Sequence, residues 1–234
     1  MIQTKKIKNL EITVPKKLAF EYDTEPDLPQ MHVNIGCVGK RSSGKTTAVV
    51  ELIDRMNYDR IFLISPTLCS NYEMLSRLNI DEEDIYEEPN DITCLDSILQ
   101  KIQDEADLLE EYRRKLKLYN FFMKNLNKNK FLSDDELLEI YDDDMKDIKK
   151  PEHWLNGRKC KIAIMIDDAL GSNLYCGNGL KKLNNLVVKH RHQGNLHTSK
   201  GALGCSLFFL VQVYTSNTGS ISKTIRNNMT GLIL

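Results

Sequence analysis

Apolar residues occur in continuous blocks along the chain, and these blocks predict five buried strands. The blocks are MHVNIGCV (31–38), RIFLIS (60–65), KIAIMI (161–166), SLFFLV (206–211) and MTGLIL (229–234). Short continuous apolar runs, bounded by turn-forming residues, are typical of strands that are covered on both faces. Such strands belong to parallel sheets with helices on either side, so the pattern predicts an α/β fold.

Helical spacing separates these blocks. In TTAVVELIDRM (46–56), three apolar residues fall on one side of a helix, namely Val49, Leu52 and Ile53. Between the second and third blocks, apolar residues again recur at helical intervals: Ile98, Ile102, Leu109, Tyr112, Leu116 and Tyr119. The run Ser133-Asp134-Asp135-Glu136 has the form of a capping box that opens another helix.

The chain length fits one domain that carries a helical insertion. We expect a single domain over residues 1–234 of the 234-residue sequence, with an insertion at 70–158. The first fifteen residues lack the apolar segment of a signal peptide, and no apolar run approaches the roughly 18 residues of a membrane span. The six cysteines include no C-x-x-C pair. We therefore expect an intracellular protein with reduced cysteines and no membrane span.

The net charge of −1 hides a strong asymmetry. Residues 81–150 hold 21 Asp and Glu against 11 Lys and Arg. After Asp168 there is no carboxylate, although seven basic residues follow: Lys181, Lys182, Lys189, Arg191, Lys200, Lys223 and Arg226. A field of this sign favours a polyanionic partner. A solvated basic face without a partner is the alternative from charge alone.

One motif carries a specific chemistry. The run Gly39-Lys40-Arg41-Ser42-Ser43-Gly44-Lys45-Thr46, followed by Thr47, fits the phosphate-binding pattern G-x-x-x-x-G-K-[ST], with a strand before it and a helix after it. The glycines let backbone N–H groups turn toward nucleotide phosphates at the start of the helix. Lys45 then reaches the β and γ phosphates, and the Thr46 hydroxyl binds Mg²⁺. This motif predicts an ATP and Mg²⁺ site.

Two acids follow the third apolar block. Asp167 is in the position from which a carboxylate holds the water shell of the metal in phosphate-loop proteins. Asp168 is the candidate base that activates the attacking water, although aspartate is one methylene shorter than the glutamate common at this position. The alternative is that the two acids only cap a following helix.

Gln212 closes the fourth apolar block. If that strand lies between the strand of the phosphate loop and the strand of Asp167, its amide points into the gap between the γ-phosphate and the attacking water. A neutral amide can donate to the phosphate and accept from the water, and so can sense the nucleotide. The alternative is that Gln212 only begins the loop QVYTSNTGS.

In chain order, the segments GKRSSGKT, RIFLISPT, IAIMIDD, KHRH, FFLVQVY and ISKTIRNN resemble the viral genome-packaging ATPases of poxviruses, other nucleocytoplasmic large DNA viruses and virophages, within the FtsK–HerA superfamily. The resemblance covers residues 31–234 except the acidic insertion. It implies a RecA-like (ASCE) sheet of order 5-1-4-3-2 and a homo-oligomeric ring of five or six subunits. It also implies ATP-driven translocation of double-stranded DNA into a capsid.

The resemblance also implies roles for individual residues. It assigns Lys45 and Thr46 to nucleotide and Mg²⁺, Asp167 to the metal, Asp168 to water activation and Gln212 to sensing. Rings of this kind complete the site with an arginine of the neighbouring subunit, and the candidates in the sequence are Arg191 and Arg226. Either arginine can instead bind DNA phosphate. Capsid or membrane-associated virion proteins are further expected partners, in the host cytoplasm and the virion.

Alternative functions remain open at this stage. A P-loop nucleoside or nucleotide kinase shares the phosphate loop and has an ordinary length of this order. A nucleotide-gated binding module that does not hydrolyse is disfavoured by the intact acid pair. The acidic insertion is not expected to face DNA; docking to a capsid protein and a solvated helical hairpin are its two interpretations.

Overall fold

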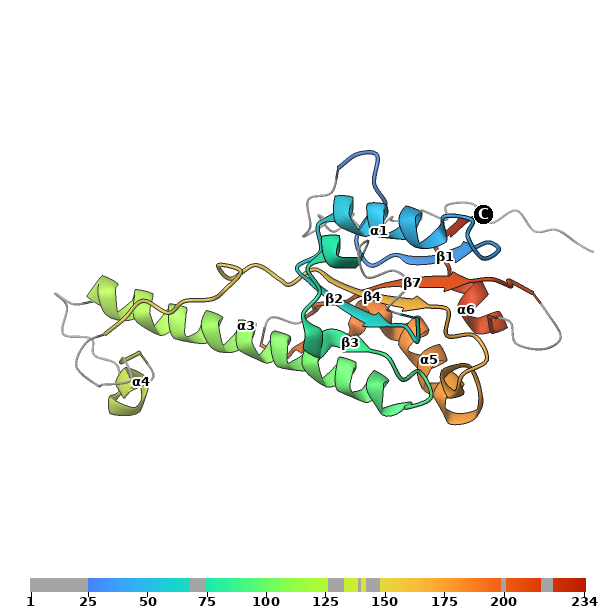
Figure 1. The fold of residues 1–234 in the computed structure, drawn as a ribbon. Coiled ribbons are helices and arrows are strands. Elements are labelled where there is room, and N and C mark those ends of the chain that lie inside the picture. Colours follow the sequence, from blue (N-terminus) through green and yellow to red (C-terminus); the bar gives the residue numbers. More distant parts are fainter. Residues whose placement is uncertain are drawn as a thin grey trace, which may run out of the picture.

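The fold is a mixed α/β arrangement around one parallel sheet (Figure 1). The computed structural model describes residues 25–67, 75–125, 133–138, 140–141, 148–198, 201–215 and 221–234. Six strands form the main sheet in the order β3-β2-β4-β7-β1-β8, and every pairing in it is parallel. The predicted α/β class with a parallel sheet is therefore confirmed.

All five predicted strands are present, and the sheet gains a sixth at one edge. The strands are β1 (Asn34–Val38), β2 (Arg60–Ile64), β3 (Ile85–Tyr86), β4 (Ile162–Asp167), β7 (Ser206–Val211) and β8 (Gly231–Ile233). Sequence periodicity did not predict β3, because its two residues are too short to form a pattern. A separate antiparallel ribbon joins β5 (Asn195–Leu196) to β6 (Gly201–Ala202).

The central strands are buried on both faces, which explains their continuous apolar sequences. In β4, Ile164 packs into the core on one side of the sheet and Met165 into the core on the other. Side chains alternate in the same way along β7, where every residue is buried. Both faces therefore need helices to cover them.

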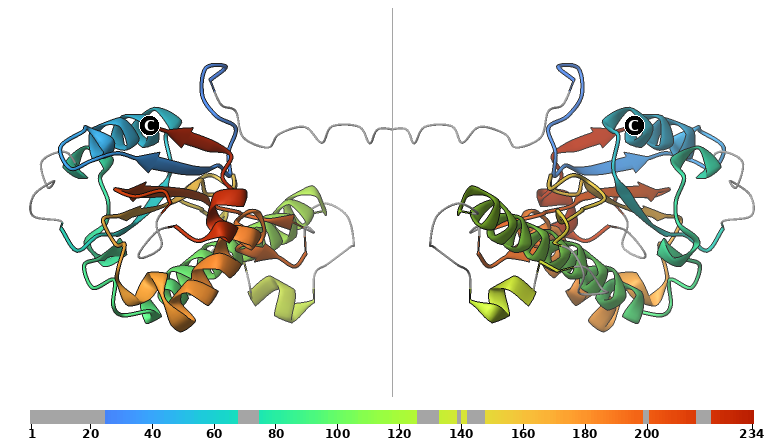
Figure 2. Two further views of the ribbon diagram at one scale, coloured as in Figure 1. Left: turned by 90° about the vertical axis from the view of Figure 1, so that its right-hand side faces the viewer. Right: turned by 90° about the vertical axis from the view of Figure 1, so that its left-hand side faces the viewer.

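Helices cover the two faces unequally (Figure 2). The helix α1 (Lys45–Met56) covers one face and buries Val49, Val50 and Ile53. The opposite face carries α3 (Thr93–Asn125), α5 (Gly177–Lys189) and α6 (Lys223–Asn227). Short 3-10 turns are η2 (Ser76–Leu78), η3 (Glu82–Asp84), η4 (Asn173–Tyr175) and η5 (His190–His192).

The helix α3 dominates the predicted insertion. It has 33 residues, so its length is roughly 50 Å. Its buried residues end at Leu109, and its outer half extends past the sheet, with the chain around His153 beside it (Figure 1). The first half packs on the sheet through residues that include Ile98 and Ile102, so it is part of the core. The limits 70–158 of the insertion remain a prediction.

The predicted capping box is present in the short helix α4 (Asp134–Leu138). The Ser133 backbone N–H donates to Glu136 Oε2 at 3.0 Å, and the Glu136 N–H donates to Ser133 Oγ at 3.3 Å. This reciprocal pair satisfies two backbone donors at the start of the helix.

A buried ion network fixes the edge of the sheet to α3. Arg60 Nε donates to Asp84 at 2.7 Å, and its Nη1 donates to Glu105 at 2.9 Å. Lys101 adds a second cation to Asp84 at 2.7 Å. Asp84 is 1% and Glu105 7% exposed, so both carboxylates depend on these partners.

The cysteines of the described residues are mostly buried. Cys37, Cys94, Cys160 and Cys205 are buried and Cys176 is exposed, whereas Cys69 lies outside the described residues. Burial raises the pKa of Cys94 to about 11, which keeps this thiol protonated. In the part of the chain that the structure describes, no helix is long and apolar enough to cross a membrane.

Candidate functional site

The phosphate loop lies between the carboxyl end of β1 and the first turn of α1. Gly44 caps α1 with φ 86°, a left-handed conformation that glycine adopts without steric cost. A Cβ atom on Gly39 would lie 2.5 Å from Ser43 Oγ. The Gly39 N–H donates to the Val211 carbonyl of β7 at 3.1 Å. Both glycines of the motif are therefore required by the geometry of the loop.

The loop opens onto a cleft of about 450 Å³. The cleft is lined by Arg41, Ser42, Ser43, Gly44, Lys45, Thr46, Thr47, Thr67, Asp167, Asp168 and Gln212. Its volume is within the usual range of small-molecule sites, and its floor is the N-terminus of a twelve-residue helix. The cleft therefore has the size and the polarity of an anion-binding site.

Two residues of the motif support the loop without lining the cleft. Gly39 allows the close approach of Ser43, as described above. Lys40 offers its carbonyl oxygen to Lys45 Nζ at 3.0 Å. Among the described residues, the Lys45 ammonium is held at the loop by one backbone oxygen, and it can exchange this acceptor for a ligand phosphate.

The acid pair lies across the cleft from the loop. Asp167 ends β4 and is 5% exposed, and the Thr46 hydroxyl donates to its Oδ2 at 3.3 Å. Burial raises the pKa of the Asp167 carboxyl, and the Asp168 charge raises it further; the Thr46 hydrogen bond and the Lys45 ammonium oppose this shift. A cation beside Asp167 would favour its ionised form.

The Thr46 hydroxyl and the Asp167 carboxylate are the two protein oxygens that suit a hard divalent cation here. Among the described residues, no group of three or more His, Cys, Asp or Glu side chains could hold a metal ion. A cation at this site would therefore need further ligands from a bound phosphate and from water, which is the usual coordination of Mg²⁺.

Asp168 has a different environment from Asp167. It is exposed and has φ 50°, so the strand direction is broken directly after Asp167. Its backbone N–H donates to the Leu210 carbonyl of β7 at 3.3 Å. Its Oδ1 accepts a hydrogen bond from Gln212 Nε2 at 2.9 Å. The two neighbouring acids thus have separate partners, one on the phosphate loop and one on β7.

Gln212 reaches this position because β7 lies between β1 and β4. The carboxyl ends of these three parallel strands meet at one edge of the sheet, as the sequence argument required. The amide nitrogen is bonded to Asp168.

The two candidate arginines lie away from the cleft. Arg191 belongs to η5, where a ring nitrogen of His190 is 3.0 Å from the carbonyl oxygen of His32, just before β1. This places Arg191 at the amino edge of the sheet, opposite the phosphate loop. Arg226 donates to the Tyr214 carbonyl at 3.1 Å and stacks over the Tyr214 ring. Neither arginine lines the cleft.

One lining residue escaped sequence reasoning. Thr67 borders the cleft and its backbone N–H donates to Ser65 Oγ at 3.3 Å. No motif marks Thr67, but it follows a buried strand at the same carboxyl edge as the other site residues. Its position just after a buried strand is the sequence feature that could have identified Thr67 as a site residue.

Comparisons with protein-family models and with curated proteins find no match. Among solved structures, the chain is similar to EssC (ATPases 2 and 3) from Geobacillus thermodenitrificans, with a TM-score of 0.40 and 14% sequence identity. The match covers 86% of this chain and 32% of the EssC chain, so this chain spans about a third of that protein's length. A match at this level assigns neither a family nor an activity.

Proposed function

We propose that this chain is a P-loop ATPase that hydrolyses ATP with Mg²⁺ and uses the reaction to translocate double-stranded DNA. The observation that carries this proposal is the meeting of Lys45, Thr46, Asp167, Asp168 and Gln212 at one cleft. These residues come from the ends of three adjacent strands, and their chemical types match the steps of ATP hydrolysis.

Nucleotide binding is assigned to the phosphate loop. The N–H groups at the start of α1 and the Lys45 ammonium receive the β and γ phosphates. Thr46 and Asp167 hold Mg²⁺ together with phosphate oxygens and water. When bound, the cation neutralises charge on the phosphates, and it also keeps the Asp167 carboxylate ionised.

Hydrolysis is assigned to Asp168 and Gln212. Because the Gln212 amide nitrogen is already bonded to Asp168, its carbonyl oxygen is available to accept a hydrogen bond from the attacking water. Asp168 accepts the proton that this water releases as its oxygen bonds to the γ-phosphorus. The bond from this phosphorus to the β–γ bridging oxygen breaks, and ADP leaves with the electron pair. Gln212 therefore orients both the base and the water.

The strand arrangement supports assignment to the RecA-like (ASCE) group. When the five strands predicted from sequence are numbered along the chain, the observed order β8-β1-β7-β4-β2 corresponds to 5-1-4-3-2. Placement of β7 next to β1 is what brings Gln212 to the cleft. The strand β3 extends this sheet at the β2 edge.

The charge distribution supports DNA as the partner. No carboxylate follows Asp168, and the exposed residues of the last third include Lys181 and Lys189. Together with the resemblance to viral packaging ATPases, this favours genome packaging by a ring of five or six subunits in the host cytoplasm and in the virion. Capsid or membrane-associated virion proteins complete the proposed set of partners.

The experiment is an ATPase assay of the purified chain with and without long double-stranded DNA. We expect DNA to stimulate hydrolysis, and the stimulation to fade as salt rises because phosphate contacts release counterions. The Lys45→Ala variant is the inactive control. Hydrolysis by an assembled oligomer that ignores DNA would contradict the proposal. Phosphate transfer to an added nucleoside monophosphate, without net hydrolysis, would indicate a kinase instead.

A further inference from the structure

The outer half of α3 carries a charge opposite to that of its surroundings. We name residues 112–125 the arm. The arm contains no carboxylate and five basic residues: Arg113, Arg114, Lys115, Lys117 and Lys124. The first half of the same helix is acidic, and it is held on the sheet by buried residues that end at Leu109. The arm is therefore a basic projection from an acidic region.

One face of the arm combines charge with an exposed aromatic ring. Lys117, Phe121 and Lys124 are spaced four and three residues apart, so they lie on one face of the helix. Phe121 is 42% exposed. Within the described residues, neither lysine side chain has a hydrogen bond or an ion pair. This face presents an apolar group between two unpaired cations.

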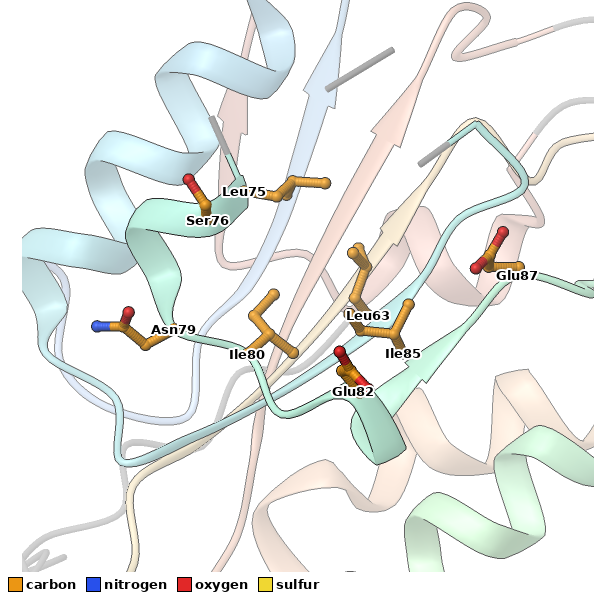
Figure 3. Close-up of a pocket in the computed structure, with 8 residues that line it drawn as sticks. All are labelled: Leu63, Leu75, Ser76, Asn79, Ile80, Glu82, Ile85 and Glu87. Carbon is orange, nitrogen blue, oxygen red and sulfur yellow. The ribbon is translucent and has the colours of Figure 1, made fainter. Parts of the chain in front are cut away.

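A pocket at the β2–β3 edge of the sheet has the complementary pattern (Figure 3). Its volume is about 500 Å³, and its apolar lining comes from Leu63 of β2, Ile85 of β3, and Leu75 and Ile80 next to η2. Ser76, Asn79, Glu82 and Glu87 complete the lining. The pocket can accept a large apolar side chain, because small-molecule sites of this size enclose comparable groups.

The rim of this pocket is acidic. Figure 3 shows Glu82 and Glu87 on either side of Ile85. Both are exposed, and neither side chain has an ion pair within the described part of the chain. Their neighbours Glu83 and Asp84 are instead bound by Arg60. The pocket thus presents an apolar floor between two unpaired carboxylates.

A chain cannot place its own arm in its own pocket. The helix α3 is fixed on the face of the sheet where Ile98 and Ile102 pack, whereas Leu63 and Leu75 belong to the core on the other face. A continuous helix that is anchored on one face does not bend around the sheet edge without a break. The complementary occupant must come from another molecule.

We propose that the arm of one copy of this chain docks in the acidic-rimmed pocket of a second copy. Phe121 fills the apolar floor, and Lys117 and Lys124 pair with Glu82 and Glu87. An aromatic anchor in an apolar pocket, surrounded by charged pairs, is the usual arrangement of a strong interface contact. The interface rests on the ring assembly of the proposed function, and it names the surfaces through which that ring forms.

The arm and the pocket are different surfaces, so the contact is head-to-tail. Each copy donates one arm and receives one, and repetition of such a contact closes into a ring when the rotation permits. Binding of the arm to nucleic acid through its basic residues is the competing use of the same surface, and the experiment separates the two.

The test uses charge reversal on each surface. The arm variant Lys117→Glu/Lys124→Glu and the pocket variant Glu82→Lys/Glu87→Lys should each be monomeric in sedimentation velocity, because like charges then face each other. An equimolar mixture should assemble with the two variants in alternation, since the reversed arm fits the reversed pocket and the native arm fits the native pocket. The control is Lys181→Glu/Lys189→Glu, which changes the charge equally on α5 and should leave assembly unchanged.

A second variant tests the apolar anchor. Phe121→Ala should weaken assembly about 30-fold, the effect expected for a truncated interface anchor. Leu138→Ala, at a residue of α4 that is 50% exposed, is its matched control and should assemble normally. Circular dichroism and thermal unfolding check that each variant is folded.

Three results would overturn the docking proposal. The wild-type chain could remain monomeric at every concentration tested with a non-hydrolysable ATP analogue. The mixture of reversed variants could fail to assemble. The arm variant could assemble normally but lose affinity for double-stranded DNA, which would make the arm a nucleic-acid contact. An oligomer that assembles as described but whose ATP hydrolysis ignores DNA would overturn the proposed function alone.

Discussion

The Gln212 amide nitrogen donates to Asp168 Oδ1 at 2.9 Å and joins the ends of two adjacent strands. Asp168 is exposed and occupies a left-handed backbone conformation, so its side chain has few other restraints. The hydrogen bond from Gln212 therefore sets the direction of the carboxylate that is the candidate base. This relationship makes Gln212 a positioning residue for Asp168.

Replacing Gln212 should slow hydrolysis more than it weakens nucleotide binding. In Gln212→Ala, Asp168 loses its orienting donor, and we expect kcat to fall on the order of 100-fold, the lower range of general-base contributions. The KM for ATP should change little, because no phosphate contact is removed. Steady-state kinetics measure both values. Val213→Ala, at the next exposed position, should be neutral; an equal loss of ATP affinity in Gln212→Ala would contradict the assignment.

The Thr46 hydroxyl should be needed for the metal and not for the shape of the loop. In Thr46→Val the oxygen beside Asp167 is lost at nearly constant volume, and we expect Mg²⁺-dependent ATP affinity to fall about 10- to 100-fold. Thr46→Ser keeps the hydroxyl and should retain most of the affinity. Titration of ATP with and without Mg²⁺ measures the effect. If both variants bind equally, Thr46 has no part in the metal site.

The two arginines should behave differently in mixed oligomers. Arg191 is exposed, has no side-chain partner among the described residues, and lies at the edge opposite its own cleft. Arg191→Ala should therefore lower hydrolysis on the order of 1000-fold, as expected for loss of an arginine finger. Addition of Lys45→Ala subunits, which supply Arg191 to their neighbours, should restore part of the rate.

Arg226→Ala is expected to show no such rescue. Its guanidinium already binds the Tyr214 carbonyl and ring of the same chain, so its loss should mainly destabilise the loop after β7. ATPase rates over a range of mixing ratios distinguish the two arginines. Rescue of Arg226→Ala and not of Arg191→Ala would reverse the assignment.

The Arg60 network should be important for stability. Arg60→Ala leaves the buried carboxylates of Asp84 and Glu105 without their main cation, and we expect the free energy of unfolding to fall by about 3–5 kcal/mol. Arg77→Ala is the control, because Arg77 pairs with Glu51 and Asp54 at the surface, where such pairs contribute ~0–1 kcal/mol. Urea denaturation measures both. If both variants lose the same free energy of unfolding, the buried Arg60 network contributes no more stability than a surface ion pair.

His153 should make the fold sensitive to acid. Its Nδ1 accepts N–H groups of Leu155 and Gly157 at 3.1 and 3.3 Å, and burial lowers the pKa of its ring. Below a pH of about 6.5 the unfolded chain therefore binds a proton that the folded chain resists, so stability falls as the pH drops. In His153→Asn this component should be absent. Urea midpoints at several pH values between about 5 and 8 measure it.

Sequence reasoning succeeded where a residue's position follows from a strand end. The five apolar blocks are strands because both of their faces are covered, and Asp167, Asp168 and Gln212 meet because parallel strands end at one edge. The prediction that Gln212 lies at the site depended on β7 being next to β1 in the sheet. The order of strands in a sheet does not follow from the periodicity of apolar residues. The strand β3 was missed because two residues leave no pattern, and its location depends on the distant partner β2.

The total charge of the insertion does not show how charge is distributed along α3. Residues 81–150 are acidic in total, yet the structure separates an acidic inner half of α3 from the basic arm. The charge count over residues 81–150 is correct, but it does not show where in the insertion the basic residues lie. A charge count over seventy residues cannot show that the sign of the charge changes within one helix. The structure shows this, because Leu109 is the last buried residue of α3 and the residues after it form the exposed arm.

The strand β2 and the turn after it serve two sites. Leu63 lines the acidic-rimmed pocket and Thr67 lines the nucleotide cleft, and four residues span at most roughly 13 Å. If an arm in the pocket changes the affinity for ATP, then bound ATP changes the affinity of the pocket for the arm by the same factor, because coupling between binding sites is reciprocal. Nucleotide turnover in one subunit would then regulate how firmly its neighbour is held.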